Sequence, residues 1–158
     1  LFLNLKSVEG MYASIEGLGQ KFGREEEAAV MLEEFDSFMT EFAEKNAGKE
    51  SPKVLVLMGL PGSYIIATDG DGQEFLFANT EDMKTKEPDV ILRAAHGLPD
   101  EARKMFAEEF STNDIWQHFK AVQEGRVYDL DSNLFNMSAN FSYEEALKAL
   151  QPMLYGEE

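Results

Sequence analysis

Cysteine is absent from the 158 residues, and its absence excludes three kinds of site. A chain without thiols carries no disulfide framework, no thiolate zinc site and no cysteine nucleophile. Long apolar runs are also lacking, since no stretch of the sequence approaches the ~20 consecutive apolar residues of a membrane-spanning helix. We therefore expect no membrane span within these residues.

Basic residues are few. Fourteen Lys and Arg stand against thirty Asp and Glu, which gives a formal net charge of −16 at pH 7. Affinity for nucleic acid depends on Lys and Arg side chains that neutralise phosphates, so this balance argues against a nucleic-acid partner. The same excess of negative charge disfavours binding to an anionic membrane surface.

The common catalytic motifs are missing as well. The sequence contains no His-Glu-x-x-His, no Gly-x-Ser-x-Gly, no P-loop and no Gly-x-Gly-x-x-Gly after a strand. Residues 69–72 (Asp-Gly-Asp-Gly) faintly resemble a calcium loop, but Thr80 occupies the twelfth position, where the loop requires Glu. The sequence therefore predicts a protein that is not an enzyme.

Helical and strand patterns alternate along most of the chain. Helical spacing of apolar residues and short apolar runs bounded by Gly and Pro indicate the two kinds of element. The predicted helices cover residues 7–22, 24–46, 80–86, 99–110, 114–123 and 142–154, and the predicted strands cover residues 53–58, 63–68, 89–93 and 127–130. Strands that alternate with helices predict an α/β fold with a mainly parallel sheet.

His96 is the residue with the clearest chemical potential. In an open parallel sheet, ligands bind beyond the carboxyl ends of the strands, and His96 follows the third predicted strand. Its neighbours Ala94, Ala95 and Gly97 are small and would let a large flat ligand approach closely. An imidazole there suits an axial ligand of heme iron. The position also suits a polar loop residue, or a residue that satisfies the start of the following helix, and spacing alone favours these interpretations over a ligand role.

Three other residues are candidates for the same site. Met58 and Met137 can pack on a macrocycle or complete the coordination of iron, although methionine more often fills gaps in a core. Arg93 can pair with a carboxylate of a ligand, because its guanidinium suits that geometry, or it can form an ordinary surface ion pair. The second histidine, His118, is expected to face solvent, since Trp116 and its apolar neighbours form the buried stripe of that helix.

Three segments together resemble a known family. Residues 87–92 (Glu-Pro-Asp-Val-Ile-Leu) resemble a strand of the substrate-binding proteins for siderophores, cobalamin and heme, and residues 116–128 resemble the Trp-x-x-Phe-x-Ala-Val-x-x-Gly-x-Val-Tyr segment of that family. Residues 15–24 and the helix after them resemble its inter-lobe region and long spine helix. Closer still, residues 93–99 and 137–139 are similar to the heme-receptor lipoproteins of Gram-positive Isd-type uptake systems.

The resemblance implies a domain plan. Residues 1–50 would form an inter-lobe segment with the spine helix, and residues 51–158 would form a Rossmann-like three-layer C-terminal lobe, with the N-terminal lobe absent. It also implies that heme is held between the lobes with His96 as one axial ligand, while a methionine of the missing lobe supplies the other. The residues expected to line the cleft beside His96 are Arg93, Met58, Met137 and Ser138.

The resemblance further implies partners and a location. Glu81 occupies the position expected to dock on arginines of an ABC permease, although it also reads as ordinary acidity at a helix start. The protein would be a Gram-positive cell-surface lipoprotein or periplasmic, held at the membrane only by a lipid anchor on the missing N-terminal part. The alternatives are a ferric siderophore or a cobalamin as ligand, or an interaction module that binds no ligand of its own.

One departure from the family pattern concerns the second predicted strand. Thr68 leads almost directly into the Asp-Gly repeat at residues 69–72, where the family carries a helix. Parallel neighbours need a crossover of roughly a dozen residues. We therefore expect a segment to be missing after Thr68, together with the part of the pocket wall that it would build.

Overall fold

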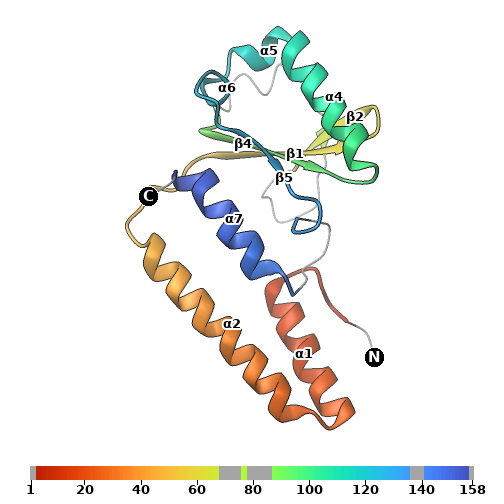
Figure 1. Cartoon of the computed structure of the whole chain (residues 1–158), viewed down its shortest axis with the longest axis vertical. Helices are drawn as coiled ribbons and strands as arrows, with labels where there is room; N and C mark the ends of the chain where they lie inside the picture. The colour runs from red at the N-terminus through yellow and green to blue at the C-terminus, as the bar shows by residue number, and fades with distance from the viewer. Residues whose placement is uncertain (1–2, 68–75, 78–86, 136–140, 157–158) are drawn as a thin grey trace. The chain divides into compact units, whose positions relative to one another are not determined.

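The computed structural model describes residues 3–67, 76–77, 87–135 and 141–156, and these residues fall into two compact units (Figure 1). The first unit comprises Leu1–Glu50 and Met137–Lys148, and the second comprises Ser51–Asn136 and Ala149–Glu158. The final helix, α7 (Tyr143–Tyr155), contributes residues to both units. Within the described part of the chain, no helix combines the length and the apolar character that crossing a membrane requires.

The first unit is built on two helices, α1 (Val8–Phe22) and α2 (Glu25–Asn46), which confirm the predictions for residues 7–22 and 24–46. Ser7 caps α1 by accepting a hydrogen bond from the backbone N–H of Gly10. Three consecutive glutamates open α2, where the helix dipole favours negative charge. The buried core of this unit consists of Met11, Ile15, Phe35 and Tyr143.

Aromatic contacts hold the start of α7 to these two helices. Phe35 meets the ring of Tyr143 edge-on, with the ring centroids 5.1 Å apart. The hydroxyl groups of Tyr12 and Tyr143 are hydrogen-bonded at 3.2 Å. Burial, and secondarily the hydrogen bond with Tyr12, raises the pKa of Tyr143, so this hydroxyl stays protonated at neutral pH.

The second unit contains a sheet whose strand order is β3-β2-β1-β4-β5 in the described residues. Adjacent β1, β4 and β5 are parallel, as predicted, whereas β2 pairs antiparallel with β1 and with β3 at one edge. The α/β class is confirmed. The strands are β1 (Val54–Leu60), β2 (Ser63–Ala67), β3 (Leu76–Phe77), β4 (Val90–Ala95) and β5 (Val127–Leu130).

The expectation of a segment missing after Thr68 stays a prediction, but the premise that supported it was wrong for this sheet. It assumed that the second strand has parallel neighbours, but β1 turns back into β2 through Pro61 and Gly62, and β2 is also antiparallel to β3. Antiparallel neighbours need no crossover helix. Residues 68–75 themselves lie outside the described residues, as does the helix predicted at residues 80–86.

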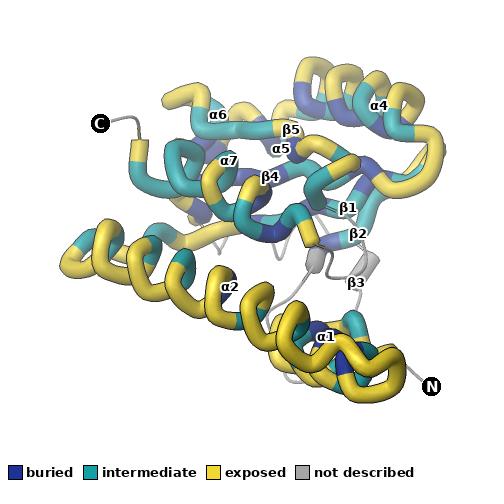
Figure 2. The backbone as a smooth tube through the Cα atoms, turned by 60° about the horizontal axis from the view of Figure 1, so that its bottom comes forward, coloured by how far each residue is buried: buried dark blue, intermediate teal, exposed yellow. Residues whose placement is uncertain are grey.

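Helices cover both faces of the sheet, so the second unit has three layers. On one face lie α4 (Pro99–Thr112), α5 (Asp114–Gln117) and α6 (Lys120–Gln123), and α4 buries its inner side while its outer side stays exposed (Figure 2). On the other face, Leu150 and Met153 from the end of α7 pack against residues of β4 and β5.

The single helix predicted at residues 114–123 is instead two short helices. The backbone is extended at Phe119 (φ −73°, ψ 130°), which separates α5 from α6. Trp116 and Phe119 are buried, and His118 is exposed as predicted. A spacing of three between buried residues fits two separate turns as well as one helix, so periodicity alone did not reveal the break.

Gly59 in β1 is required by a close approach to α4. A Cβ atom at this position would lie 2.5 Å from Cε2 of Phe106, a side chain with no exposed surface. We expect Gly59→Ala to destabilise the fold by about 1–3 kcal/mol, because the buried ring has no room to move. Urea denaturation followed by circular dichroism measures the effect.

Gly17→Ala is the matched control for this substitution. Gly17 lies inside α1, and a Cβ atom there would meet nothing within 4 Å. Alanine at an open helical position should stabilise by about 0.5–1 kcal/mol. Equal effects of the two substitutions would contradict the close packing of Phe106 on β1.

Candidate functional site

The carboxyl ends of the three parallel strands meet at one edge of the sheet. Gly59 of β1 is level with Ala95 of β4, and Ala94 is level with Leu130 of β5. The residues that follow each strand therefore emerge side by side. This is the edge at which open α/β sheets bind ligands.

His96 is the first residue after β4 at this edge. Its backbone N–H donates to the carbonyl oxygen of Gly59 at 2.9 Å, which continues the ladder between β4 and β1 for one more residue. The side chain is exposed, and no described residue hydrogen-bonds its imidazole. Its backbone position is thus fixed by the sheet, while both ring nitrogens remain open to a ligand.

The chain turns sharply just after His96. Gly97 and Leu98 both have left-handed backbones, with φ of 60° and 39°, and α4 begins at Pro99. Glycine adopts this conformation readily, but leucine rarely does. The turn places an exposed leucine two residues from the imidazole.

Arg93 has a partner within the protein. Its Nε and Nη2 atoms donate to the two carboxylate oxygens of Asp129 on β5, at 2.8 and 2.7 Å. Its guanidinium also lies over the ring of Phe110, 4.9 Å from the centroid, and only 14% of the side chain is exposed. The ion pair considered from sequence is therefore formed, and a contact between Arg93 and a ligand carboxylate stays a prediction.

Met58 and Arg93 occupy opposite faces of the sheet. Side chains alternate between faces along a strand, and Met58 is level with Ala94, which lies on the face covered by α7. Arg93 is instead on the face of α4, over Phe110. A ligand lying against one face would not contact both. The other predicted site residues, Met137, Ser138 and Glu81, lie outside the described residues.

His118 does not belong to this edge. It ends α5, and its Nδ1 atom lies 2.8 Å from the backbone oxygen of Asp114, the residue one turn earlier. Among the residues that the structure describes, no cluster of three or more His, Cys, Asp or Glu side chains is placed to hold a bare metal ion.

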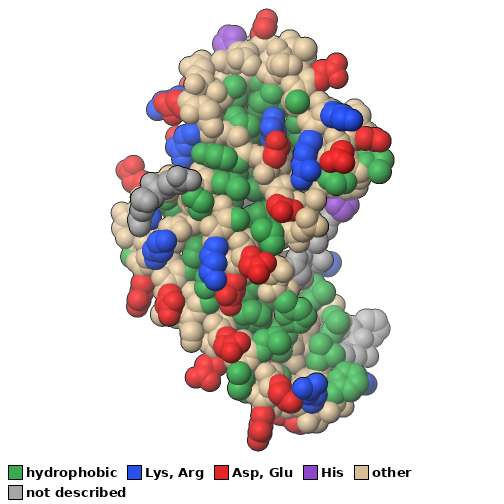
Figure 3. Space-filling view, in the orientation of Figure 1, with side chains coloured by type: hydrophobic (Ala, Val, Ile, Leu, Met, Phe, Trp, Pro, Cys, Tyr) green, Lys and Arg blue, Asp and Glu red, His purple; other side chains and the backbone are tan. Residues whose placement is uncertain are grey.

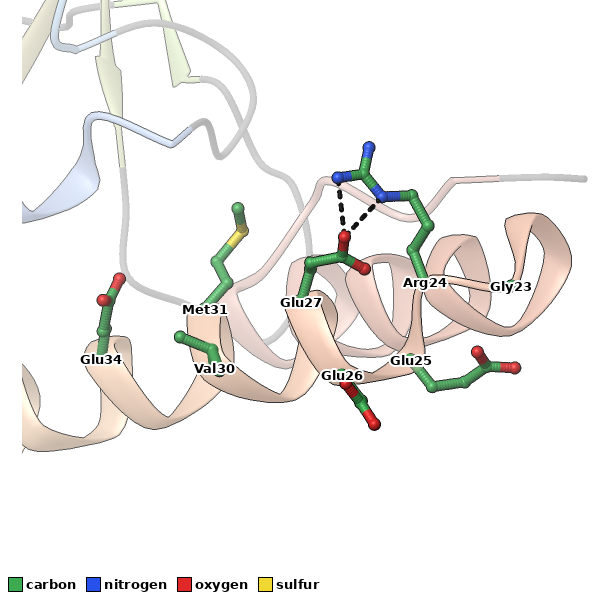
Figure 4. Close-up of a pocket in the computed structure, with 8 residues that line it drawn as sticks. All are labelled: Gly23, Arg24, Glu25, Glu26, Glu27, Val30, Met31 and Glu34. Carbon is green, nitrogen blue, oxygen red and sulfur yellow. Dashed lines mark hydrogen bonds and ion pairs between the residues drawn. The ribbon is translucent and has the colours of Figure 1, made fainter.

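Two of the concave surfaces on the first unit include residues at the junction of α1 and α2, and the sequence did not predict them. One is lined by residues 23–27 with Val30, Met31 and Glu34, and Arg24 pairs there with Glu27 while the Glu25 and Glu26 side chains point away from that pair (Figure 4). The other is mainly apolar, and Figure 3 shows hydrophobic side chains gathered over α1 and α2. Its apolar lining includes Ile15, Leu18, Phe22, Met31 and Phe141.

Neither surface offers the features of a ligand site. The first gathers carboxylates around one paired arginine, and the two charged side chains that line the second, Arg24 and Glu27, are already paired with each other. Both depend on how α1 and α2 pack, which the helical pattern of each segment does not specify. The carboxyl edge with His96 is therefore the better candidate among the described residues.

Comparison with known proteins identifies relatives over nearly the whole chain. A family model described as "Periplasmic binding protein" matches residues 65–134. The high-affinity heme uptake system protein IsdE of Staphylococcus aureus (strain Newman) is 39% identical over 98% of the chain, and the match spans 59% of that protein. The chain thus spans about three fifths of the curated relatives that it matches.

Comparison with solved structures identifies relatives of the same kind. An ABC transporter substrate-binding protein from Listeria monocytogenes EGD-e is 43% identical with a TM-score of 0.88, covering 99% of this chain and 68% of that one. S. aureus IsdE complexed with heme is 38% identical with a TM-score of 0.88, covering 98% and 67%. These relatives are binding and transport proteins rather than enzymes, in agreement with the sequence prediction.

Proposed function

Because the chain belongs to the periplasmic binding protein family, we propose that it forms the C-terminal lobe and spine helix of a substrate-binding protein that delivers heme to an ABC importer. The observation that carries this proposal is the exposed imidazole of His96 at the carboxyl edge of the sheet, with no protein partner among the described residues. The protein would work outside the cytoplasmic membrane, as a cell-surface lipoprotein or in a periplasm.

Heme is the ligand that best fits the site and the relatives together. One relative at 39% identity is described as a heme uptake protein, and a structural neighbour at 38% identity is complexed with heme. Histidine is a common axial ligand of heme iron. The small residues Ala94, Ala95 and Gly97 leave space around His96 for a macrocycle to approach.

The remaining predicted contacts belong to the proposal too. Arg93 would keep its pair with Asp129 and offer a ligand carboxylate the N–H groups left outside that pair, which are the two on Nη1 and the second one on Nη2. Met58 would reach the ligand only from the strand end, and Met137 and Ser138 are proposed as further ligand contacts. Glu81 would serve the separate step of docking on the permease.

The apolar groove of the first unit is evidence for the proposal that a second lobe packs against it. Phe22 and Phe141 beside this groove are 66% and 63% exposed, which is unusual for phenylalanine. We propose that an N-terminal lobe covers this surface and supplies the second iron ligand, a methionine. Heme would then lie between the two lobes.

Absorbance titration tests the ligand. Ferric heme, aquocobalamin and a ferric siderophore are each added to the chain, and the spectrum and the free ligand after filtration are measured. We expect a shifted Soret band that saturates near one equivalent of heme, and no retention of the other two. If the chain retains aquocobalamin or the ferric siderophore and heme gives no Soret shift, the family assignment stands and the proposal that heme is the ligand is contradicted.

If the chain retains none of the three ligands, the result favours the alternative of an interaction module that binds no ligand of its own. In that case the chain would act by docking on a permease or by self-association, and Glu81→Ala would impair it. A Soret shift that grows without saturation indicates nonspecific adsorption and also contradicts the proposal.

A further inference from the structure

We propose that Leu98 is a ligand-contacting residue, whose side chain forms an apolar wall beside the iron-binding imidazole of His96; this inference rests on the heme-binding function proposed above. Three observations support it. Each concerns a structural preference that Leu98 violates, and no packing of its side chain compensates for the violation.

The first observation is the backbone conformation. Only Leu98 and Glu87 among the described non-glycine residues have positive φ, and Leu98 follows Gly97 in the same left-handed region. Steric repulsion between Cβ and the backbone disfavours this conformation for leucine, whereas asparagine and glycine tolerate it. Strained backbone of this kind persists where the surrounding structure imposes it, and it clusters at functional sites.

The second observation is the position at the start of α4. Leu98 is the N-cap residue, where Ser, Thr, Asp or Asn would accept a hydrogen bond from a free backbone N–H. Leucine makes no such bond. Its backbone oxygen accepts from Glu101 and Ala102, at 3.0 and 3.2 Å, but any residue would provide that oxygen. The helix therefore gains nothing from the leucine side chain.

The third observation is exposure. The side chain of Leu98 is 59% exposed and belongs to none of the hydrophobic clusters of the described residues. Burial in the protein core thus does not explain it. Residues that violate local structural preferences, with no compensating gain in stability, are expected at functional sites. Leu98 lies two residues after His96, at the carboxyl ends of the parallel strands where the ligand is proposed to bind. Ligand sites are lined mainly by apolar side chains.

The chemistry of the ligand matches this wall. A porphyrin is largely apolar, and a single bond from imidazole to iron fixes the position of the metal but leaves the macrocycle free to rotate about that bond. An apolar side chain packed on the macrocycle adds contact area and limits this rotation. Leu98 would therefore act as a positioning and specificity-determining residue, and His96 would remain the iron ligand.

The decisive variant is Leu98→Asn, because asparagine suits both the left-handed backbone and the N-cap. We expect its melting temperature to rise by about 2–4 °C and its heme affinity to fall about tenfold or more. Leu98→Ala should lose affinity without the gain in melting temperature. The matched control is Val54→Ala, which removes a 39% exposed apolar side chain at the opposite end of β1 and should leave heme affinity unchanged.

Heme affinity is measured by Soret titration and stability by thermal circular dichroism. If both Leu98 variants bind heme as tightly as the parent while His96→Ala does not, the Leu98 inference is overturned and the heme function stands. A lower melting temperature of Leu98→Asn would assign the leucine a structural role and also overturn it. If the parent chain binds no heme, the result contradicts both the proposed function and this inference.

Discussion

Replacing His96 with alanine is expected to lower the heme affinity of the chain by about 100-fold or more. Even partners that only orient a metal ligand change metal affinity about 10–100-fold, so losing the ligand itself should cost at least as much. The fold should not suffer, because the imidazole is exposed and bonded to no described residue. The backbone N–H of residue 96 can still donate to Gly59. A Soret titration of parent and variant measures the loss.

Two further variants make the result specific. His118→Ala removes the other histidine, which is exposed in the same unit but lies after α5, and it should bind heme like the parent. His96→Met supplies a thioether that can also coordinate heme iron, so part of the binding should return with an altered spectrum. Equal Soret shifts in the parent and in His96→Ala would rule out His96 as the iron ligand.

The helices and strands of this chain could mostly be predicted from sequence because their apolar spacing is regular. The prediction for β5 at residues 127–130 has the observed bounds, and Ser7 and Gly23 flank α1 as capping chemistry suggests. The direction of β2 was not predictable from its apolar run. A run of this kind occurs in parallel and antiparallel strands alike. The signal that could have given its direction is the short connection to β1, which is too short for a parallel crossover.

Side-chain partners across the sheet were harder to predict than the elements themselves. Arg93 and Asp129 are 36 positions apart, and they meet because the parallel register sets them opposite each other on β4 and β5. One residue of slip would have moved Arg93 away from this carboxylate and turned it to the other face. The sequence could therefore offer the ion pair only as one of two alternatives.

Of the proposed site, the place of His96 could be predicted from sequence, but that of Leu98 could not. A histidine after a strand and among small residues stands out by its chemistry. A leucine before Pro99 does not, because its side chain normally signals a core position. Only the backbone angle and the exposure of Leu98 distinguish it, and both depend on how β4 turns into α4.

Replacing Trp116 with alanine is expected to be the most destabilising single change considered, at about 3–5 kcal/mol. Trp116 has no exposed surface, and its ring stacks on Phe110 with the centroids 4.2 Å apart. It also contacts the rings of Phe119 and Tyr64. Alanine would leave a cavity among aromatic side chains that β2, α4 and the extended residue between α5 and α6 hold in place, so the site could not collapse fully.

A polar network adds to this cost. One carboxylate oxygen of Glu109 accepts hydrogen bonds from the Trp116 indole, the Asn113 amide and the Tyr64 hydroxyl, at 3.2, 2.8 and 3.1 Å. Burial, together with the neighbouring Glu109 carboxylate, raises the pKa of Tyr64 to about 12, so its hydroxyl remains a donor at neutral pH. Loss of the indole N–H removes one of three donors.

Trp116→Phe separates packing from hydrogen bonding. Phenylalanine retains most of the ring contact with Phe110 but cannot donate to Glu109, so we expect a smaller loss, about 1–2 kcal/mol. Urea denaturation followed by circular dichroism suits both variants, because the chain has a single tryptophan and fluorescence would be lost with it. If Trp116→Phe costs as much as Trp116→Ala, the hydrogen bond to Glu109, which both variants lose, would dominate the contribution of this residue to the fold, and the buried stack would not.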